Sequence, residues 1–165
     1  MTSPGSANAC GGTMAILKTA GRMADRMQIG TGVKFALGEN PKSVYNDRDE
    51  TPITRMATAA MIREGLAKAQ RDQQELDFAE SDPDEHMPDY DAKSEALLPL
   101  LERDVKAHFH CHRADDICTA IRIAKEFNLD YVIIHGTEGH LIADILAEEN
   151  APVIAGPILC DRCKP

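Results

Sequence analysis

The segment from Val105 to Ala155 alternates short, largely apolar runs with helical patterns, and this alternation limits the folds open to the chain. Three runs, Val105 to His110, Tyr131 to His135 and Pro152 to Ala155, have the character of strands buried on both faces. Strand–helix–strand repeats form right-handed crossover units on a parallel sheet. The sequence therefore predicts an α/β protein, and the alternation fits a (β/α)8 barrel and an open doubly wound sheet equally well.

Upstream of these units the pattern predicts two further strands, Val33 to Leu37 and a short one from Met14 to Leu17. Thr51 is a suitable N-cap for a long helix, because its hydroxyl can accept from a backbone N–H. Pro52 would then occupy the first helical position, where a missing N–H costs little. The predicted helices are Thr51 to about Ala79, Ala92 to about Leu101, Ala114 to Phe127 and Gly139 to Glu149.

Charge and composition limit the classes of function. A formal net charge of -9 argues against nucleic-acid binding, because phosphate contacts require clustered Lys and Arg. No apolar run is long enough to cross a bilayer, and the first residues lack the pattern of a secretory signal. We therefore expect a cytoplasmic protein that binds neither membrane nor nucleic acid, with its five cysteines as reduced thiols.

Histidines are concentrated near the ends of the predicted strands. His110 and His135 end two consecutive strands, and the carboxyl ends of neighbouring parallel strands meet at one edge of a sheet. Two imidazoles at that edge can share a zinc or related ion, whereas a lone histidine is more often structural or solvated. His108 lies earlier in its strand and is expected to be a packed core residue. The pair predicts a metal site.

Several polar residues are candidates for the surroundings of this site. Glu39 follows the strand from Val33 to Leu37, so its carboxylate is expected at the same edge, where it would suit a divalent ion. A solvated loop acid is the alternative. His112 lies past its strand end and is expected to contact substrate or to orient a ligand. Arg113 and His140 are further candidates for contact with a carboxylate-bearing substrate.

Cys160 and Cys163 form a single CxxC pair close to the end of the sequence. One such pair without a second is a weak signal for zinc or redox chemistry, and incidental spacing is the preferred interpretation. A small zinc protein organised by this pair is one hypothesis for the chain, and it is the one that the sequence favours least.

Four segments resemble the imidazolonepropionase-related branch of the amidohydrolase superfamily: TSPGSANACGG, VKFALGENPKSVY, HFHCHRADDICTAIRIAKEF and VIIHGTEGHLIADILAEENAPVIAGP. The pattern HxHRADDI followed by IxHGTEGH is the specific part, and only residues 71–90 show little likeness. The resemblance implies a (β/α)8 barrel with one or two divalent metals, usually zinc, at the carboxyl ends of its strands. It also implies that a metal-activated water attacks an amide or cyclic amide C–N bond in a small-molecule substrate.

On this resemblance His110 follows barrel strand 5, His135 follows strand 6, and Glu39 follows strand 4, where relatives carry a bridging carboxylate or carbamylated lysine. Residues 1–165 would form one partial TIM-barrel domain of roughly strands 3 to 7. The family's HxH motif after strand 1 and its aspartate after strand 8, the usual proton shuttle, have no counterpart. No catalytic residue is therefore assigned, and the isolated chain is expected to turn over little substrate.

Two functions follow from these expectations. The first is a metal-dependent hydrolase represented by a partial barrel, with a homo-oligomer or a complementing chain supplying the remaining strands. The second is a non-catalytic βα scaffold that serves as a binding or oligomerisation module, because open sheet edges invite pairing with other chains. The substrate and the identity and number of the metals stay open.

Overall fold

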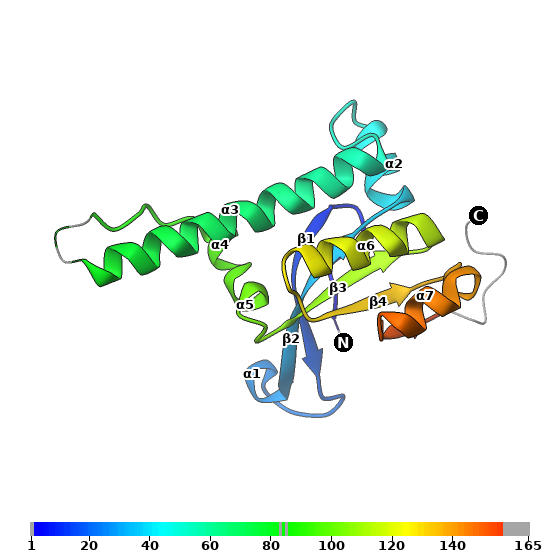
Figure 1. Cartoon of the computed structure of the whole chain (residues 1–165). Helices are drawn as coiled ribbons and strands as arrows, with labels where there is room; N and C mark the ends of the chain where they lie inside the picture. The colour runs from blue at the N-terminus through cyan, green and yellow to red at the C-terminus, as the bar shows by residue number, and fades with distance from the viewer. Residues whose placement is uncertain (1, 83, 85, 157–165) are drawn as a thin grey trace.

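A five-stranded sheet organises the computed structural model, which describes residues 2–82, 84 and 86–156 (Figure 1). The strands lie side by side in chain order, with β1 antiparallel to β2 and all later neighbours parallel. The predicted α/β class with a mostly parallel sheet is therefore confirmed. The strands are β1 (Cys10–Leu17), β2 (Gln28–Ala36), β3 (Lys106–Cys111), β4 (Tyr131–His135) and β5 (Val153–Ala155).

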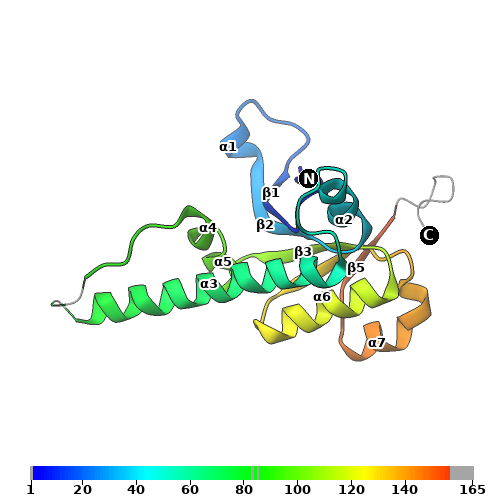
Figure 2. The ribbon, with the colours of Figure 1, turned by 90° about the horizontal axis from the view of Figure 1, so that it is seen from above.

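Helices connect the strands and cover one face of the sheet. Figures 1 and 2 show the long helix α3 and the shorter helix α6 running beside each other along this face. None of the helices in the described part of the chain is both long and apolar enough to span a membrane. The helices are α1 (Ala24–Met27), α2 (Glu39–Asn46), α3 (Arg55–Ser81), α4 (Ala92–Glu95), α5 (Leu98–Leu101), α6 (Ala114–Glu126), the 3-10 helix η1 (Gly139–Ile142) and α7 (Ala143–Glu148).

The hydrophobic core lies between the sheet and these helices. Phe35 of β2 and Phe109 of β3 are fully buried there, with ring centroids 5.2 Å apart. Helix α6 covers them with the apolar face that its sequence pattern predicts, including Ile117 and Ile123. Removing such side chains from water is the main stabilising term in a fold of this kind.

The opposite face of the same strands carries polar side chains, since successive residues of a strand point to opposite sides. Lys34 of β2 and His108 of β3 are partners in the parallel ladder, and both are buried. The Lys34 ammonium donates to the carbonyl of Pro4 at 3.3 Å and to the hydroxyl of Ser6 at 3.4 Å. Burial lowers the pKa of Lys34. The N-terminal segment around Pro4 and Ser6 thus contacts this face of the sheet at Lys34.

Helix boundaries differ from the predictions in three places, one of which is the helix predicted from Gly139 to Glu149, where the structure has η1 followed by α7. Thr54, not Thr51, caps α3, because its hydroxyl accepts from the backbone N–H of Ala57 at 3.1 Å. Pro52 follows a cis peptide bond and lies before the helix. The single helix predicted over Ala92 to Leu101 is two short helices, α4 and α5. The second begins anew with a proline in its first turn, where a proline is tolerated.

Strands β1 and β2 begin earlier than predicted, at Cys10 and Gln28 rather than Met14 and Val33. The added residues include several glycines and polar side chains, which give no apolar signal. The two strands are joined by a short connection and pair as antiparallel neighbours, whereas parallel strands need a longer crossover.

The turn from β2 into α2 depends on Gly38, whose φ of 81° and ψ of -136° are accessible almost only to glycine. A Cβ atom on this residue would lie 2.4 Å from Oδ2 of Asp116. Asp116 is buried in the first turn of α6, and Arg55 of α3 donates to its Oδ2 at 3.3 Å. Burial raises the pKa of Asp116, and Arg55 opposes that shift. The β2–α2 turn, α3 and α6 therefore meet at one close contact.

We predict that Gly38→Ala lowers the free energy of unfolding by about 3 kcal/mol, because it combines a disfavoured backbone conformation with a clash against a buried carboxylate. Urea denaturation measures the change. Gly5→Ala is the matched control, since a Cβ at that position meets nothing within 4 Å. Equal stability of the two variants would contradict the role given to this turn.

Candidate metal centre

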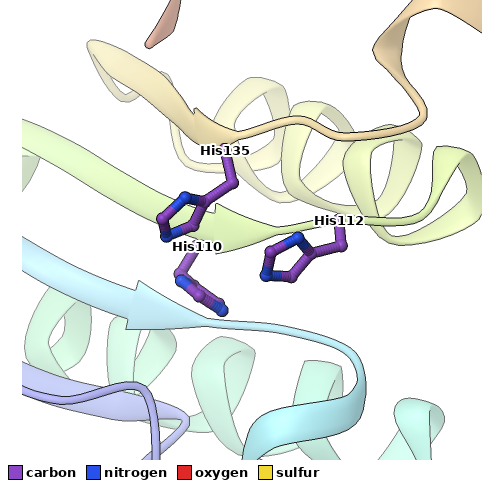
Figure 3. A group of neighbouring side chains, drawn as sticks. All are labelled: His110, His112 and His135. Atoms are coloured by element: carbon purple, nitrogen blue, oxygen red, sulfur yellow. The ribbon is translucent and has the colours of Figure 1, made fainter. Parts of the chain in front are cut away.

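Three histidines converge where β3 and β4 end (Figure 3). His110 belongs to β3, His112 follows that strand, and His135 is the last residue of β4. One ring nitrogen from each can be chosen so that all three lie within 4.8 Å of one another. The ring centroids are 4.6 Å apart for His110 and His135, and 4.8 Å for His110 and His112. Three imidazoles so arranged could bind a metal ion.

The backbone of His135 turns its ring toward the other two. In the parallel ladder His135 pairs with Cys111, whose side chain belongs to the core on the helix side of the sheet. A regular strand would point His135 the same way. Instead His135 has a φ of 73° and Gly136 a φ of 54°, so the chain enters the left-handed region as the strand ends. Strained conformations of this kind are concentrated at functional sites.

Hydrogen bonds hold each of the three rings. The Nδ1 of His135 donates to the carbonyl of Gly156, which leaves its Nε2 as the nitrogen with an available lone pair. The Nδ1 of His112 lies 2.8 Å from the hydroxyl of Thr137. The His110 ring contacts the Asn40 amide, with Nε2 and Nδ2 2.8 Å apart. Such partners fix ring orientation and tautomer, as they do for metal-bound histidines.

Glu138 joins the loop after β4 to the loop after β3. Its backbone N–H donates to the carbonyl of His112 at 2.8 Å, and its carboxylate accepts from the N–H of Ala114 at 2.9 Å. That N–H belongs to the first turn of α6, where backbone donors have no partner within the helix. Sequence reasoning misses this bridge, because no local signal reports a contact between two loops 24 residues apart.

Glu39 begins α2, and its side chain is 51% exposed. It accepts from the hydroxyl of Ser43 at 2.8 Å and forms ion pairs with Lys42 at 3.4 Å and Arg55 at 3.6 Å. The Ser43 hydrogen bond, with the two cations, lowers the pKa of Glu39. The histidine cluster in the described residues does not include it, and its role as a metal ligand stays a prediction.

The other candidate residues lie on the loops that follow β3 and β4. Arg113 precedes α6, and its Nε donates to Asp115 at 3.0 Å, which raises the pKa of the guanidinium. His140 lies in η1, is exposed, and contacts the carbonyl of Thr137 at 3.2 Å. A substrate role for either residue stays a prediction.

No cysteine in the described residues belongs to the histidine cluster. Cys111 is buried among apolar side chains, and burial raises the pKa of its thiol, which disfavours the thiolate that binds metals. Cys160 and Cys163 lie outside the described residues, so the hypothesis of a zinc protein organised by this pair is not tested.

Comparison with known proteins shows which proteins this chain is similar to. No protein-family model matches the chain. It is 28% identical over 165 residues to amidohydrolase tasK of Hapsidospora irregularis, a match that covers 87% of this chain and 17% of tasK. A crystal structure of an amidohydrolase from Thermotoga maritima MSB8 is 41% identical, with a TM-score of 0.91 over 98% of this chain and 42% of that one. These matches support the amidohydrolase superfamily.

The chain spans less than half the length of either relative. The superfamily expected from the sequence is thus supported, and the close structural match extends over nearly the whole of this chain.

We predict that Glu138→Ala lowers the free energy of unfolding by about 1 kcal/mol, because an N–H at the start of α6 loses its acceptor. Glu138→Gln keeps an acceptor oxygen and should lose less. Chemical denaturation measures both changes against Glu75→Ala, an exposed glutamate on α3. A Glu138→Ala protein as stable as the Glu75→Ala protein would show that the bridge between the loops contributes nothing.

Proposed function

We propose that this chain forms part of the metal centre of an imidazolonepropionase-related amidohydrolase, a hydrolase of amide or cyclic amide C–N bonds in small molecules. The observation that supports this function is the convergence of His110, His112 and His135 in a chain that matches amidohydrolases. The site lies at the carboxyl ends of parallel strands, where (β/α)8 barrels carry their active sites. A partial barrel is accordingly the architecture that we propose.

The donor set fits a divalent ion such as zinc. Neutral imidazole is a common zinc ligand, and three protein ligands with one open position are the usual arrangement of a catalytic zinc site. The ring of His135 already presents Nε2, because Nδ1 is engaged by a backbone carbonyl. A bound ion would supply the Lewis acidity that makes water a nucleophile near neutral pH. The histidines would hold that ion at the edge where the strands end.

The surrounding residues provide positioning and recognition in this proposal. Glu39 stays a candidate anionic ligand, because it adjoins Asn40, which contacts His110. Arg113 and His140 are exposed on the loops after β3 and β4, where substrate specificity in barrels is determined. We propose that they contact a carboxylate of the substrate. No general base is assigned among the described residues.

A binding or oligomerisation module is the second candidate function, and strand β5 favours it. Within the described residues β5 pairs only with β4, and Val153 and Ile154 on it are 37% and 49% exposed. An exposed apolar edge strand is a template for pairing with another strand. A second copy or a complementing chain could therefore add to the sheet at β5.

Metal content tests the proposed site directly. We expect purified protein dialysed against zinc to retain about one ion per chain, and the double variant His110→Ala/His135→Ala to lose it, because two of three nitrogen ligands are removed. Inductively coupled plasma mass spectrometry measures the ratio. His86→Ala, which removes an exposed loop imidazole, is the matched control. Equal zinc in the double variant and in this control would place the metal elsewhere.

Chelation tests the proposed chemistry. The protein, alone and with any copurifying partner chain, is assayed against a panel of amides and cyclic amides that carry a carboxylate. We expect C–N hydrolysis to be lost after chelation and restored by zinc, because the nucleophilic water depends on the ion. Hydrolysis that persists in metal-free protein contradicts this mechanism. Zinc binding without any hydrolysis favours the module over the enzyme.

A further inference from the structure

One end of the sheet projects from the molecule as a two-stranded ribbon, residues 16–30. Strand β2 pairs with β3 only from Gly32 onward, so the described residues 16–17 of β1 and 28–30 of β2 pair only with each other. The one-turn helix α1 lies at the end of this ribbon, beyond the other strands (Figures 1 and 2). An isolated pair of strands is marginally stable in water, so the ribbon would gain stability from a surface that packs against it.

The ribbon combines exposed apolar side chains with cations. Met23 is 51% exposed and Ile29 is 61% exposed. Lys18, Arg22 and Arg26 are exposed, and within the described chain none of them forms an ion pair. Cations outnumber acids in the ribbon, although the whole chain has a formal net charge of -9. Methionine and arginine are enriched where proteins bind each other, so this surface has the composition of an interface.

A second projection of the molecule has the opposite charge. Helix α3 continues past the sheet, and the chain that follows it runs back beside it (Figures 1 and 2). We call residues 72–82 and 86–91 the acidic arm. Two aromatic side chains on the arm face solvent, Phe78 at 58% exposed and Tyr90 at 79%. The arm contains neither lysine nor arginine, and its acids are Asp72, Glu75, Asp77, Glu80, Asp82, Asp89 and Asp91.

A hollow of about 200 Å³ lies on the acidic arm, between α3 and the returning chain. Its apolar lining includes Leu76, Met87 and Tyr90, and the carboxylates of Asp89 and Glu95 also line it. Pockets for drug-sized ligands are larger, at about 300–1,000 Å³, so this hollow suits one or two side chains of another protein.

The carboxylates of the hollow differ in whether they are already neutralised. Lys68 pairs with Asp72 at 2.5 Å and with Asp91 at 2.7 Å. Asp89 and Glu95 are exposed, and neither forms an ion pair in the part of the chain that the structure describes. Two carboxylates beside an exposed aromatic ring fit an arginine, whose guanidinium pairs with carboxylates and stacks on aromatic faces.

We propose that the ribbon of one copy of this chain docks on the acidic arm of a second copy. The two arginines of the ribbon pair with Asp89 and Glu95, and Met23 packs beside Tyr90 in the hollow. Within one copy the ribbon and the arm point in different directions (Figures 1 and 2), so the contact forms between copies.

Charge complementarity selects a second copy as the occupant, because each chain carries both surfaces. A two-fold arrangement uses the ribbon and the arm of both copies and forms the contact twice. The net charge of -9 makes the copies repel each other at long range, but salt screens that repulsion beyond about 8 Å at physiological ionic strength. This inference does not depend on the proposed metal site, and zinc-loaded and metal-free protein should associate equally.

Charge reversal tests the pairing, with analytical ultracentrifugation of the full chain as the readout. At about 100 µM we expect the wild type at twice 18.0 kDa, because a dissociation constant near 1 µM gives mostly dimer there. Arg22→Glu/Arg26→Glu and Asp89→Arg/Glu95→Arg should each raise the dissociation constant at least about 30-fold, the effect of losing one strong contact. An equimolar mixture of the two variants should restore the dimer, because the reversed ribbon of one meets the reversed arm of the other.

Two control variants separate this contact from other causes. Arg48→Glu/Arg122→Glu makes the same change of charge at exposed residues outside both surfaces and should stay dimeric. Ile154→Lys disrupts the exposed edge strand β5 and should stay dimeric as well. A dimer that is lost in Ile154→Lys and kept in the reversed variants would assign the second copy to β5 and overturn the proposal.

The remaining outcomes are equally decisive. A monomeric wild type, or a dimer that both reversed variants keep, would overturn the proposal. Two monomeric variants that stay monomeric when mixed would overturn it too, because the reversed charges would then not be partners. Raising the salt from about 0.01 M to 1 M should weaken the dimer, since screening shortens the reach of the charges. A dimer that salt strengthens would contradict the ionic contact.

Discussion

The parallel pairing of β3 with β4 is the constraint on which the candidate metal centre depends. Its register places Cys111 beside His135 and His110 beside Ile134, so both strands end at one edge. The left-handed turn at His135 and Gly136 then moves the last side chain across the sheet to the face of His110. Without that register and that turn, the two imidazoles would lie on opposite faces of the sheet.

The loops beyond these strands are held by polar contacts that also reach the helices. Glu138 links the carbonyl of His112 to the first turn of α6. On the other side, Arg55 pairs with Asp116 beneath Gly38 and fixes the turn that carries Asn40. Loss of one partner from a buried or half-buried network of this kind destabilises the protein. Such networks therefore hold a site in one geometry. The histidine cluster is therefore supported from both neighbouring loops.

Much of the fold could be predicted from local patterns, while most of the site's inner contacts could not. Helix α6 and strand β4 match their predicted bounds closely, because apolar spacing and strand-end signals are local. That His110 and His135 reach the same edge of the sheet follows from their places at strand ends, but their rings meet only because of the turn at His135. The contacts of Glu138 and Asn40 depend on packing between distant loops, and the direction of the His135 ring depends on a positive φ, neither of which a spacing rule reports.

X-ray absorption spectroscopy of the zinc-loaded protein tests the central claim, that imidazoles of the β3 and β4 ends hold the ion. The account predicts a shell of nitrogen ligands at about 2.0–2.1 Å with the multiple-scattering pattern of imidazole. That pattern should disappear from the zinc bound by His110→Ala/His135→Ala. A shell of sulfur at about 2.3 Å would contradict the account, because it would place the metal on cysteines such as Cys160 and Cys163.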